Sequence, residues 1–350
     1  MLTLPRLYAI VIALSASINA LSQELDRSVF IRLASSLVKI EALGADGKLS
    51  LGTGVTVAPG RIATNCHVTR NATNITMLRG GLRWRVVGQL ADVAHDICVL
   101  HAPRLDAIPA PLGKAATLKL GQAVGAIGFE GGIGIQFRQG RVTALHMLDG
   151  SSVLRSSTPF TSGASGGGLF NNAGELVGLL TFRQRGTDGS YFSVPIDWLS
   201  ASIGDNLKYV PIAPLDLKLK AFWQHAIESL PYFMQANSLE VDQKWVPLLQ
   251  LTNRWSSVDK ESIEPWIAQA GAYDGLARPD DAIKSFEEAL KRNPDSSEAW
   301  LGLARVYAKQ GNEQKFQLMQ QNLQRLNPDL AAEIAKEQPA KLLRSNQPKS

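Results

Sequence analysis

Three residues whose side chains could act together in nucleophilic chemistry occur in the order histidine, aspartate, serine: His67, Asp96 and Ser165. A serine hydroxyl is a poor nucleophile near neutral pH unless a base takes its proton, and that base needs an orienting group. His67 can act as the base and Asp96 can orient it. Ser165 has a favourable setting, because the glycines of the stretch 161–169 let the backbone turn sharply beside a ligand.

The negative charge that develops during such an attack also needs stabilisation. The attacked carbonyl oxygen becomes an oxyanion, and backbone N–H groups can hold it. We expect the N–H groups of Gly163 and Ser165 to do so, since glycine can adopt the backbone conformation that an oxyanion hole requires. Ser162 is a rival nucleophile, but it lacks the pair of glycines that follows Ser165.

Cys66 and Cys98 are the two cysteines of the chain, and they lie close in sequence to the candidate histidine and aspartate. If His67 and Asp96 touch, the cysteines also come together, so we expect a disulfide beneath these residues in an oxidising compartment. Two buried thiols are one alternative. A zinc site formed by both cysteines with His67 and His95 is another, although its ligand spacing is irregular. We expect no metal and no other cofactor.

Short β-rich runs separated by Gly and Pro surround these residues. They lie at 27–60, 61–65, 74–78, 83–87, 96–101, 123–128, 133–138, 141–145, 152–155, 176–182 and 191–195. Many short strands without intervening helices predict antiparallel barrels or sandwiches.

The sequence pattern changes near residue 196, and beyond it apolar residues recur at the intervals of an α-helix. Three pairs of residues then share a spacing of 34: Trp266 and Trp300, Tyr273 and Tyr307, Pro294 and Pro328. This is the period, with the marker residues, of tetratricopeptide repeats. The pattern resembles two such repeats at about 262–295 and 296–329. Because two repeats bury little core alone, we expect helices within 218–260 and 329–337 to cap them.

The motifs around the candidate catalytic residues resemble those of the trypsin-like serine proteases, and those of the exported Deg/HtrA-type peptidases in particular. The matching segments are Gly52-Thr53-Gly54-Val55, Thr64-Asn65-Cys66-His67-Val68, His95-Asp96-Ile97-Cys98-Val99-Leu100 and Gly163-Ala164-Ser165-Gly166-Gly167. The order His, Asp, Ser is that of chymotrypsin-type enzymes. The resemblance implies two six-stranded β-barrels with the active site in the cleft between them, and hydrolysis of peptide bonds through an acyl-enzyme. Ala164 and Cys66 depart from the family's pattern, and helical repeats replace the usual PDZ domain.

The same resemblance assigns residues that would bind substrate or support the site. Pro159 would lie at the base of the S1 pocket, where the lack of a nearby acid implies small or medium apolar residues at P1. Thr181 stands where the family's buried serine helps to hold the aspartate. Phe182 and Arg183 lie on the strand that pairs with the substrate backbone.

The predicted fold class is therefore multidomain, with an all-β double barrel of the chymotrypsin type followed by an all-α tetratricopeptide-repeat domain. The N-terminus reads as a secretory signal, because an arginine, a short apolar run and small residues follow one another. An uncleaved N-terminal anchor is the alternative. In chain order we expect a signal peptide at 1–20, the protease domain at 24–203, a linker at 204–222, the helical domain at 223–338 and a flexible basic tail at 339–350.

The composition is that of a globular chain, with 45% hydrophobic and 19% charged residues among 350. The net charge of +5 comes with no aromatic platform beside the basic tail, which disfavours nucleic-acid binding. We expect a periplasmic or secreted serine endopeptidase with a protein or peptide substrate, a protein partner on the repeats, and no stable membrane span after signal removal. An oligomer is left open. The alternatives are a protease-like scaffold or chaperone that works by binding and, less well supported, an esterase on the same fold.

Overall fold

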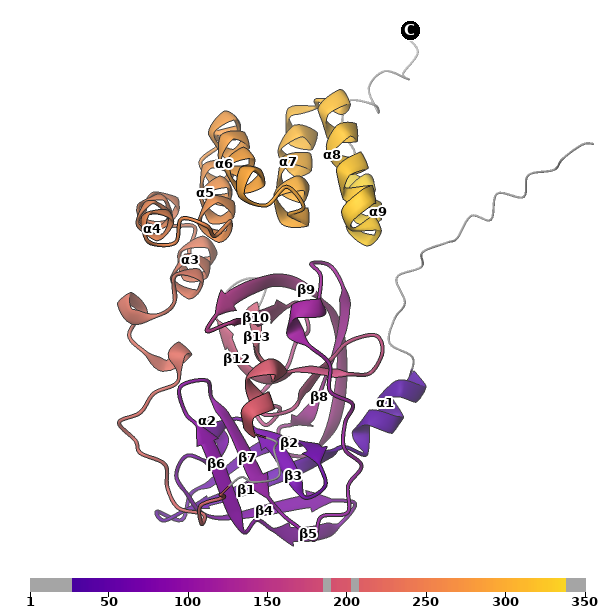
Figure 1. Ribbon diagram of the computed structural model, residues 1–350, viewed down its shortest axis with the longest axis vertical. Helices are drawn as coiled ribbons and strands as arrows, with labels where there is room; N and C mark the ends of the chain where they lie inside the picture. The colour runs from indigo at the N-terminus through magenta and orange to yellow at the C-terminus, as the bar shows by residue number, and fades with distance from the viewer. Residues whose placement is uncertain (1–26, 185–189, 203–207, 338–350) are drawn as a thin grey trace, which may run out of the picture.

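The computed structural model describes residues 27–184, 190–202 and 208–337. The expected signal peptide and the expected basic tail lie outside the described residues. The described chain forms a β-rich part, to which an arch of helices is attached (Figure 1). This arrangement confirms the predicted fold class.

The first β unit is a sheet of antiparallel neighbours in the order β5-β4-β1-β2-β3-β7-β6. Its strands are β1 (Leu37–Gly44), β2 (Leu49–Ala58), β3 (Arg61–Thr64), β4 (Ala72–Arg79), β5 (Leu82–Arg85), β6 (Gly88–Asp92) and β7 (Ile97–His101). The sheet therefore has seven strands instead of the expected six.

A bend between β5 and β6 explains the extra strand. The backbone N–H of Val86 donates to Ile75 in β4, whereas that of Val87 donates to His101 in β7. The chain thus leaves one edge of the sheet and joins the other within two residues. β5 and β6 therefore correspond to one strand with a bend, like the bent strands at the corners of small barrels.

The second β unit is a closed barrel in the order β10-β13-β12-β11-β8-β9. Its strands are β8 (Ala123–Glu130), β9 (Gly134–Leu148), β10 (Ser151–Ser156), β11 (Gly168–Phe170), β12 (Leu176–Gln184) and β13 (Ser190–Pro195). The long strand β9 joins two runs that the sequence suggested as separate strands. β11, the strand that follows Ser165, is only three residues long and was not predicted.

The helices are α1 (Arg27–Ala34), α2 (Cys66–Thr69), α3 (Tyr232–Val241), α4 (Trp245–Val258), α5 (Glu264–Gly275), α6 (Pro279–Arg292), α7 (Ser297–Gln310), α8 (Glu313–Leu326) and α9 (Pro328–Ile334). Helix α1 corrects the expectation of β structure from residue 27. Val29, Phe30 and Leu33 share one helical face there, and all three pack into the core between the β units. Short 3-10 turns lie at Ala115–Thr117, Ile196–Ser202, Phe222–Gln224, Ile227–Ser229 and Ala335–Glu337.

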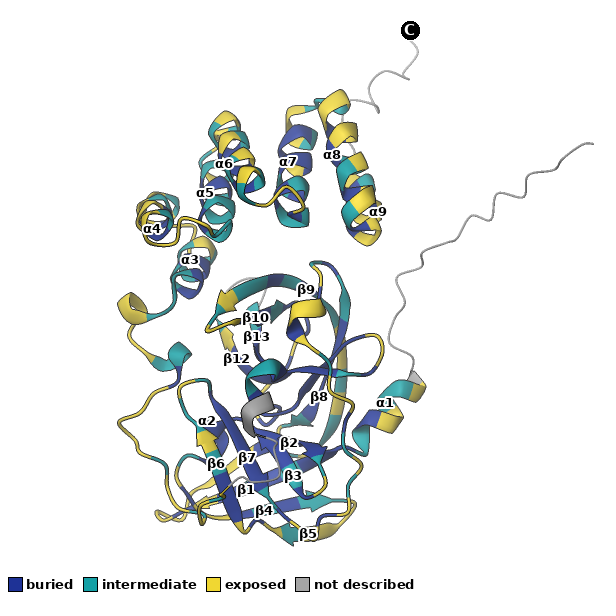
Figure 2. Cartoon of the chain, viewed as in Figure 1, coloured by how far each residue is buried: buried dark blue, intermediate teal, exposed yellow. Residues whose placement is uncertain are grey.

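The pairs α5–α6 and α7–α8 occupy the two predicted repeats, with α3, α4 and α9 on either side. Their contact surfaces are buried, and the outer faces of the helices are exposed (Figure 2). Phe286 of α6 packs where α7 carries Gly302, since a Cβ at that glycine would lie 2.2 Å from the phenylalanine ring. Small residues at such crossings allow the helices to pack closely.

The helical arch rests on the second barrel through specific contacts. His146 of β9 bonds Glu264 at the start of α5 with an Nδ1–Oε2 distance of 2.7 Å, and its ring stacks on Phe233 of α3. At the far end of the arch, Nδ2 of Asn327 donates to the carbonyl of Leu120 at 2.7 Å. The repeats are therefore docked on the β part at both ends of the arch.

Candidate active site

His67 and Asp96 are 29 residues apart in the chain and touch in the fold. Strand β3 ends at Thr64, and the one-turn helix α2 that follows carries His67. Asp96 immediately precedes β7, the neighbour of β3 in the sheet. Nδ1 of His67 lies 2.7 Å from Oδ2 of Asp96, and the backbone N–H of His67 donates to Oδ1 at 2.9 Å. A proton on Nδ1 is thereby held by the carboxylate, which leaves Nε2 available as a base.

Asp96 is held in an unusual conformation. Only 1% of its surface is exposed, and its φ of 59° is in the left-handed region, which aspartate tolerates better than most residues. The amide of Asn65 donates to the Asp96 carbonyl at 3.0 Å and to the Thr181 hydroxyl at 3.2 Å. Asn65 thus connects the two β units beneath the histidine.

Thr181 does not hold the aspartate in the way that the resemblance implied. Its hydroxyl donates to the carbonyl of Leu179 at 2.7 Å, and it accepts hydrogen bonds from Asn65 and from the backbone N–H of Val194. The proton of the Thr181 hydroxyl therefore lies in the hydrogen bond to Leu179 in the same strand. Thr181 reaches Asp96 only indirectly, through the amide of Asn65.

The structure contains the disulfide between Cys66 and Cys98, with Cα atoms 4.9 Å apart. The bond joins α2 to β7 and so fixes the two elements that carry His67 and Asp96. Both cysteines are buried. Because their sulfur atoms are bonded to each other, neither is free to bind zinc in the alternative site considered from the sequence.

The loop that carries Ser165 is fastened to the first sheet by Thr53 of β2. The backbone N–H of Thr53 donates to the carbonyl of Ser165 at 2.8 Å, and its hydroxyl donates to the carbonyl of Gly163 at 2.8 Å. Gly166 has a φ of 80°, and a Cβ there would lie 3.0 Å from the backbone nitrogen of Asn65. The serine loop therefore packs directly against the segment that leads to the histidine.

The peptide between Ser162 and Gly163 has a fixed direction. The Ser162 carbonyl accepts a hydrogen bond from the backbone N–H of Gly131 at 2.7 Å. Since the C=O and N–H of a trans peptide point to opposite sides, the N–H of Gly163 points away from Gly131. Gly163 has a φ of 95°, and a Cβ there would lie 2.4 Å from the carbonyl oxygen of Phe129, so only glycine fits.

The peptide between Ala164 and Ser165 is oriented in a similar way, because the Ala164 carbonyl accepts from the N–H of Gly167 at 2.8 Å. Within the part of the chain that the structure describes, the N–H groups of Gly163 and Ser165 donate to no other protein group. Two unpaired donors this close along the chain can together stabilise one negatively charged oxygen.

The hydroxyl of Ser165 is partly exposed, and no hydrogen bond joins it to His67 or to any other described residue. The fold thus brings the serine loop against Asn65, two residues before His67, but without a hydrogen bond between Ser165 and His67. Hydrogen bonds between a nucleophile and its base are often long until a substrate is bound.

The residues expected to bind substrate differ in exposure. Phe182 is 8% exposed and stacks on Phe192 and Trp223, with ring centroids 4.8 Å and 4.9 Å away. Arg183, the next residue of β12, is exposed. Pro159 is also exposed, so it does not form the floor of an enclosed pocket in this conformation.

Trp223 is a site residue that sequence reasoning missed. It belongs to the short turn Phe222–Gln224, which begins at the last residue of the segment expected to be a linker. Its indole Nε1–H donates to Oδ2 of Asp96 at 3.1 Å, and its ring meets His67 edge to face at 5.4 Å. A lone tryptophan after a proline-containing segment gives no sequence signal for this contact.

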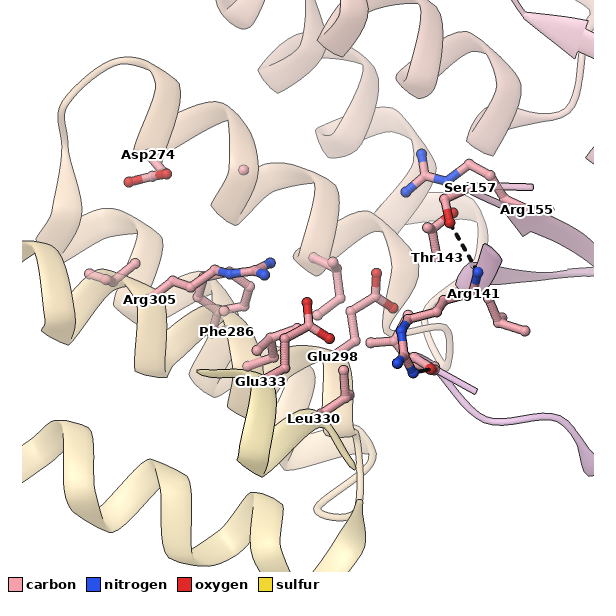
Figure 3. Close-up of a pocket in the computed structure, with 18 of the residues that line it drawn as sticks. Arg141, Thr143, Arg155, Ser157, Asp274, Phe286, Glu298, Arg305, Leu330 and Glu333 are labelled. Carbon is pink, nitrogen blue, oxygen red and sulfur yellow. Dashed lines mark hydrogen bonds between the residues drawn. The ribbon is translucent and has the colours of Figure 1, made fainter. Parts of the chain in front are cut away.

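A cavity of about 540 Å³ lies elsewhere, between the second barrel and the helical arch (Figure 3). Arg141 and Arg155 line it from the barrel, and Glu298 of α7 lines it from the arch. Burial raises the pKa of Glu298 to about 7; Arg155 acts against this shift, whereas Glu264 and Glu240 add to it. The inner surface of the arch thus faces the barrel and carries an acid whose charge is disfavoured.

Two parts of the chain match known protein families. Residues 52–179 match the trypsin-like peptidase domain, and residues 267–318 match the tetratricopeptide repeat. The first match contains His67, Asp96 and Ser165. The second covers α6, α7 and parts of their neighbours, which confirms that the 34-residue period marks tetratricopeptide repeats.

Among curated proteins, a probable periplasmic serine endoprotease DegP-like of Pseudomonas fluorescens is 35% identical over 170 residues, which are 45% of this chain and 35% of that protein. The serine endoprotease DegS of Haemophilus influenzae is 32% identical over 161 residues, which are 42% of this chain and 47% of that protein. The chain therefore spans between about a third and a half of the length of these relatives.

Among solved structures, the active form of the protease Rv3671c from M. tuberculosis superposes with a TM-score of 0.50 at 22% identity. The match covers 61% of this chain and 98% of that structure. At this level of identity, the likeness establishes the fold of the β part.

Proposed function

We propose that this chain, in which a trypsin-like peptidase domain is followed by a tetratricopeptide repeat, is an exported serine endopeptidase. The observation that carries the proposal is the contact of His67 with the buried Asp96, next to a glycine-rich serine loop with two unpaired N–H groups. Its domains would be a signal peptide at 1–20, the protease domain at 24–203, a linker at 204–222, the helical domain at 223–338 and a basic tail at 339–350.

In this proposal, Ser165 is the nucleophile, His67 the base and Asp96 the orienting group. As Oγ of Ser165 attacks the scissile carbonyl carbon, its proton passes to Nε2 of His67, and Nδ1 keeps its hydrogen bond to the carboxylate. The carboxylate stabilises the imidazolium that forms. Its burial strengthens this interaction, because little water screens the two charges.

The tetrahedral intermediate places a negative charge on the former carbonyl oxygen, and the N–H groups of Gly163 and Ser165 would hold it. His67 then gives its proton to the leaving amine, and the C–N bond breaks to leave an acyl-enzyme on Ser165. A water molecule, deprotonated by the same histidine, releases the acid and restores the serine.

Substrate would bind as an extended strand along β12, at Phe182 and Arg183, because an added strand satisfies its own backbone groups there. We propose small or medium apolar residues at P1, with Pro159 near that pocket; efficient cleavage after Lys or Arg would contradict this preference. The repeats would bind a protein partner. Relatives named as periplasmic endoproteases and the N-terminal sequence both support a periplasmic or secreted location.

A fluorophosphonate probe tests the proposal, since it reacts with an activated serine and needs no knowledge of the substrate. We expect the wild-type protein to be labelled, and Ser165→Ala to lose labelling and peptide hydrolysis by at least about 10⁴-fold. Ser162→Ala is the matched control, because it removes an exposed hydroxyl three residues away and should keep both.

Failure of the wild-type protein to react, in the presence of intact disulfide, would refute the peptidase. It would favour the alternative in which the barrel and the repeats act as a scaffold or chaperone. Labelling that is lost in Ser162→Ala but kept in Ser165→Ala would instead reassign the nucleophile.

A further inference from the structure

Oδ2 of Asp96 receives two hydrogen bonds, from His67 and from Trp223. The Nδ1–Oδ2 distance to the histidine is 2.7 Å, and the Nε1–Oδ2 distance to the indole is 3.1 Å. The tryptophan lies 127 residues beyond the aspartate in the chain. A part of the molecule outside the matched peptidase region thus supplies a donor to the carboxylate at the centre of the site.

The nearby side chains of Thr181 and Asn65 in the β units do not donate to the carboxylate of Asp96. The hydroxyl of Thr181, expected to support the aspartate, donates to Leu179 instead. The amide of Asn65 reaches the backbone carbonyl of Asp96 and not its carboxylate. A buried carboxylate needs several donors to remain ionised, and a charge-assisted bond is stronger than a neutral one.

Trp223 is held firmly by its neighbours. Its ring stacks on Phe182 with centroids 4.9 Å apart and planes 15° apart. The backbone N–H of Phe222 donates to the carbonyl of Ala94, two residues before the aspartate, at 3.0 Å. On the other side, the amide oxygen of Gln224 accepts a hydrogen bond from Arg70 at 3.2 Å.

The segment before the tryptophan is also tied to the first sheet. Val210 exchanges backbone hydrogen bonds with Gln89 in β6, and Arg70 donates to the carbonyls of Leu217 and Leu219. The chain then continues through a second short turn to α3, the first helix of the arch (Figure 1). The described residues 208–224 therefore form a strap along the β part, and Trp223 lies near its end.

We propose that Trp223 is a positioning residue for the pair formed by Asp96 and His67, so that the strap between the barrel and the helical arch completes the active site. The catalytic consequence of this inference rests on the proposed function, whereas the contact between Trp223 and Asp96 does not. The indole N–H fixes the carboxylate rotamer and draws part of its negative charge, and the ring edge limits the movement of the imidazole.

The contact is tested by ¹⁵N NMR of the indole N–H groups in the full-length protein. The resonance that is missing from Trp223→Phe identifies the residue among the seven tryptophans. In Asp96→Asn, which removes the charge of the acceptor, we expect that resonance to move upfield while the other indole signals stay in place. An unmoved resonance would overturn the proposal, whether or not the protein is a peptidase.

The positioning role is tested by kinetics. Trp223→Phe keeps the stacking ring but loses the donor, so we expect kcat and the rate of fluorophosphonate labelling to fall about tenfold or more, with KM changed by less than about twofold. The acid limb of the pH–rate profile should move to higher pH. A carboxylate without its second donor holds the imidazolium more strongly, so the base is freed of its proton only at higher pH.

Trp300→Phe is the matched control, because it also removes an indole hydrogen bond, to the carbonyl of Pro294 at 2.8 Å, but within the repeats. It should leave kcat and the pH profile as in the wild type. If Trp223→Phe behaves like Trp300→Phe, the positioning role is wrong. If it instead lowers KM and raises kcat, the tryptophan obstructs the substrate site and the proposal is also overturned. A wild-type protein that is not labelled refutes the proposed function alone.

Discussion

Removal of the Cys66–Cys98 disulfide should destabilise the first sheet strongly. The bond joins two residues 32 positions apart in the chain, one in α2 and one in β7. Loop closure of that length lowers the entropy of the unfolded chain by an amount worth about 4 kcal/mol at 25 °C. Because domains of this size are stable by only about 5–15 kcal/mol, the loss is a large fraction of the total.

The perturbation is the double variant Cys66→Ala and Cys98→Ala, compared with oxidised wild type in guanidinium denaturation. The barrel and the arch need not unfold together, so each transition is fitted separately. We expect the free energy of unfolding of the β part to fall by about 4 kcal/mol in the double variant. A reductant should lower the free energy of unfolding of the wild type by a similar amount. The reductant should leave the double variant unchanged, which is the internal control.

The same bond joins the helix of His67 to the strand that follows Asp96, so its loss should also slow fluorophosphonate labelling. A double variant within about 1 kcal/mol of oxidised wild type would refute the loop-entropy reasoning. Two free thiols in the denatured, unreduced protein would show that the bond does not form in solution.

Two further changes test other parts of the molecule. Gly163→Ala should lower labelling of the serine by about a hundredfold or more, with far-UV circular dichroism measured alongside to check the fold. Gly163 has a φ of 95°, and a Cβ there would lie 2.4 Å from the Phe129 carbonyl oxygen, so the oxyanion loop must move. Unchanged labelling would remove Gly163 from the site. Glu298→Gln should raise the melting temperature at pH 8 and change it little at pH 5. Burial raises the pKa of Glu298 from 4.5 to about 7, so the unfolded chain loses this proton first and wild-type stability falls as pH rises between those values, by up to about 3 kcal/mol. Equal gains at both pH values would contradict that shift.

The features that the sequence predicted correctly are encoded locally. The repeats follow from a period, because each 34-residue unit must present the same packing residues to its neighbours. The sharp turns at Gly163 and Gly166 follow from the glycines themselves, because their positive φ values and close contacts exclude other residues. The disulfide needed one step more, since it follows from the cysteines' positions only if His67 and Asp96 touch.

The errors arise where the same local pattern suits two environments. The alternating residues from 27 onward form α1, because Val29, Phe30 and Leu33 also share a helical face and the core accepts them on that face. The strand predicted at 83–87 includes the bend at Val86 and Val87, where the chain passes from one edge of the sheet to the other, and β6 beyond the bend was not predicted. Thr181 occupies the expected position, but its hydroxyl turns to its own strand.

By itself, the sequence determined the residue types available for chemistry, their order and the two kinds of fold, because these depend on composition and short periods. Only the tertiary structure decided what surrounds Asp96. The donor at its carboxylate comes from Trp223, 127 residues away, and reaches it through a strap with no periodicity and no motif. A contact of that kind is fixed by the packing of distant segments against one another, and no local pattern in the chain encodes it.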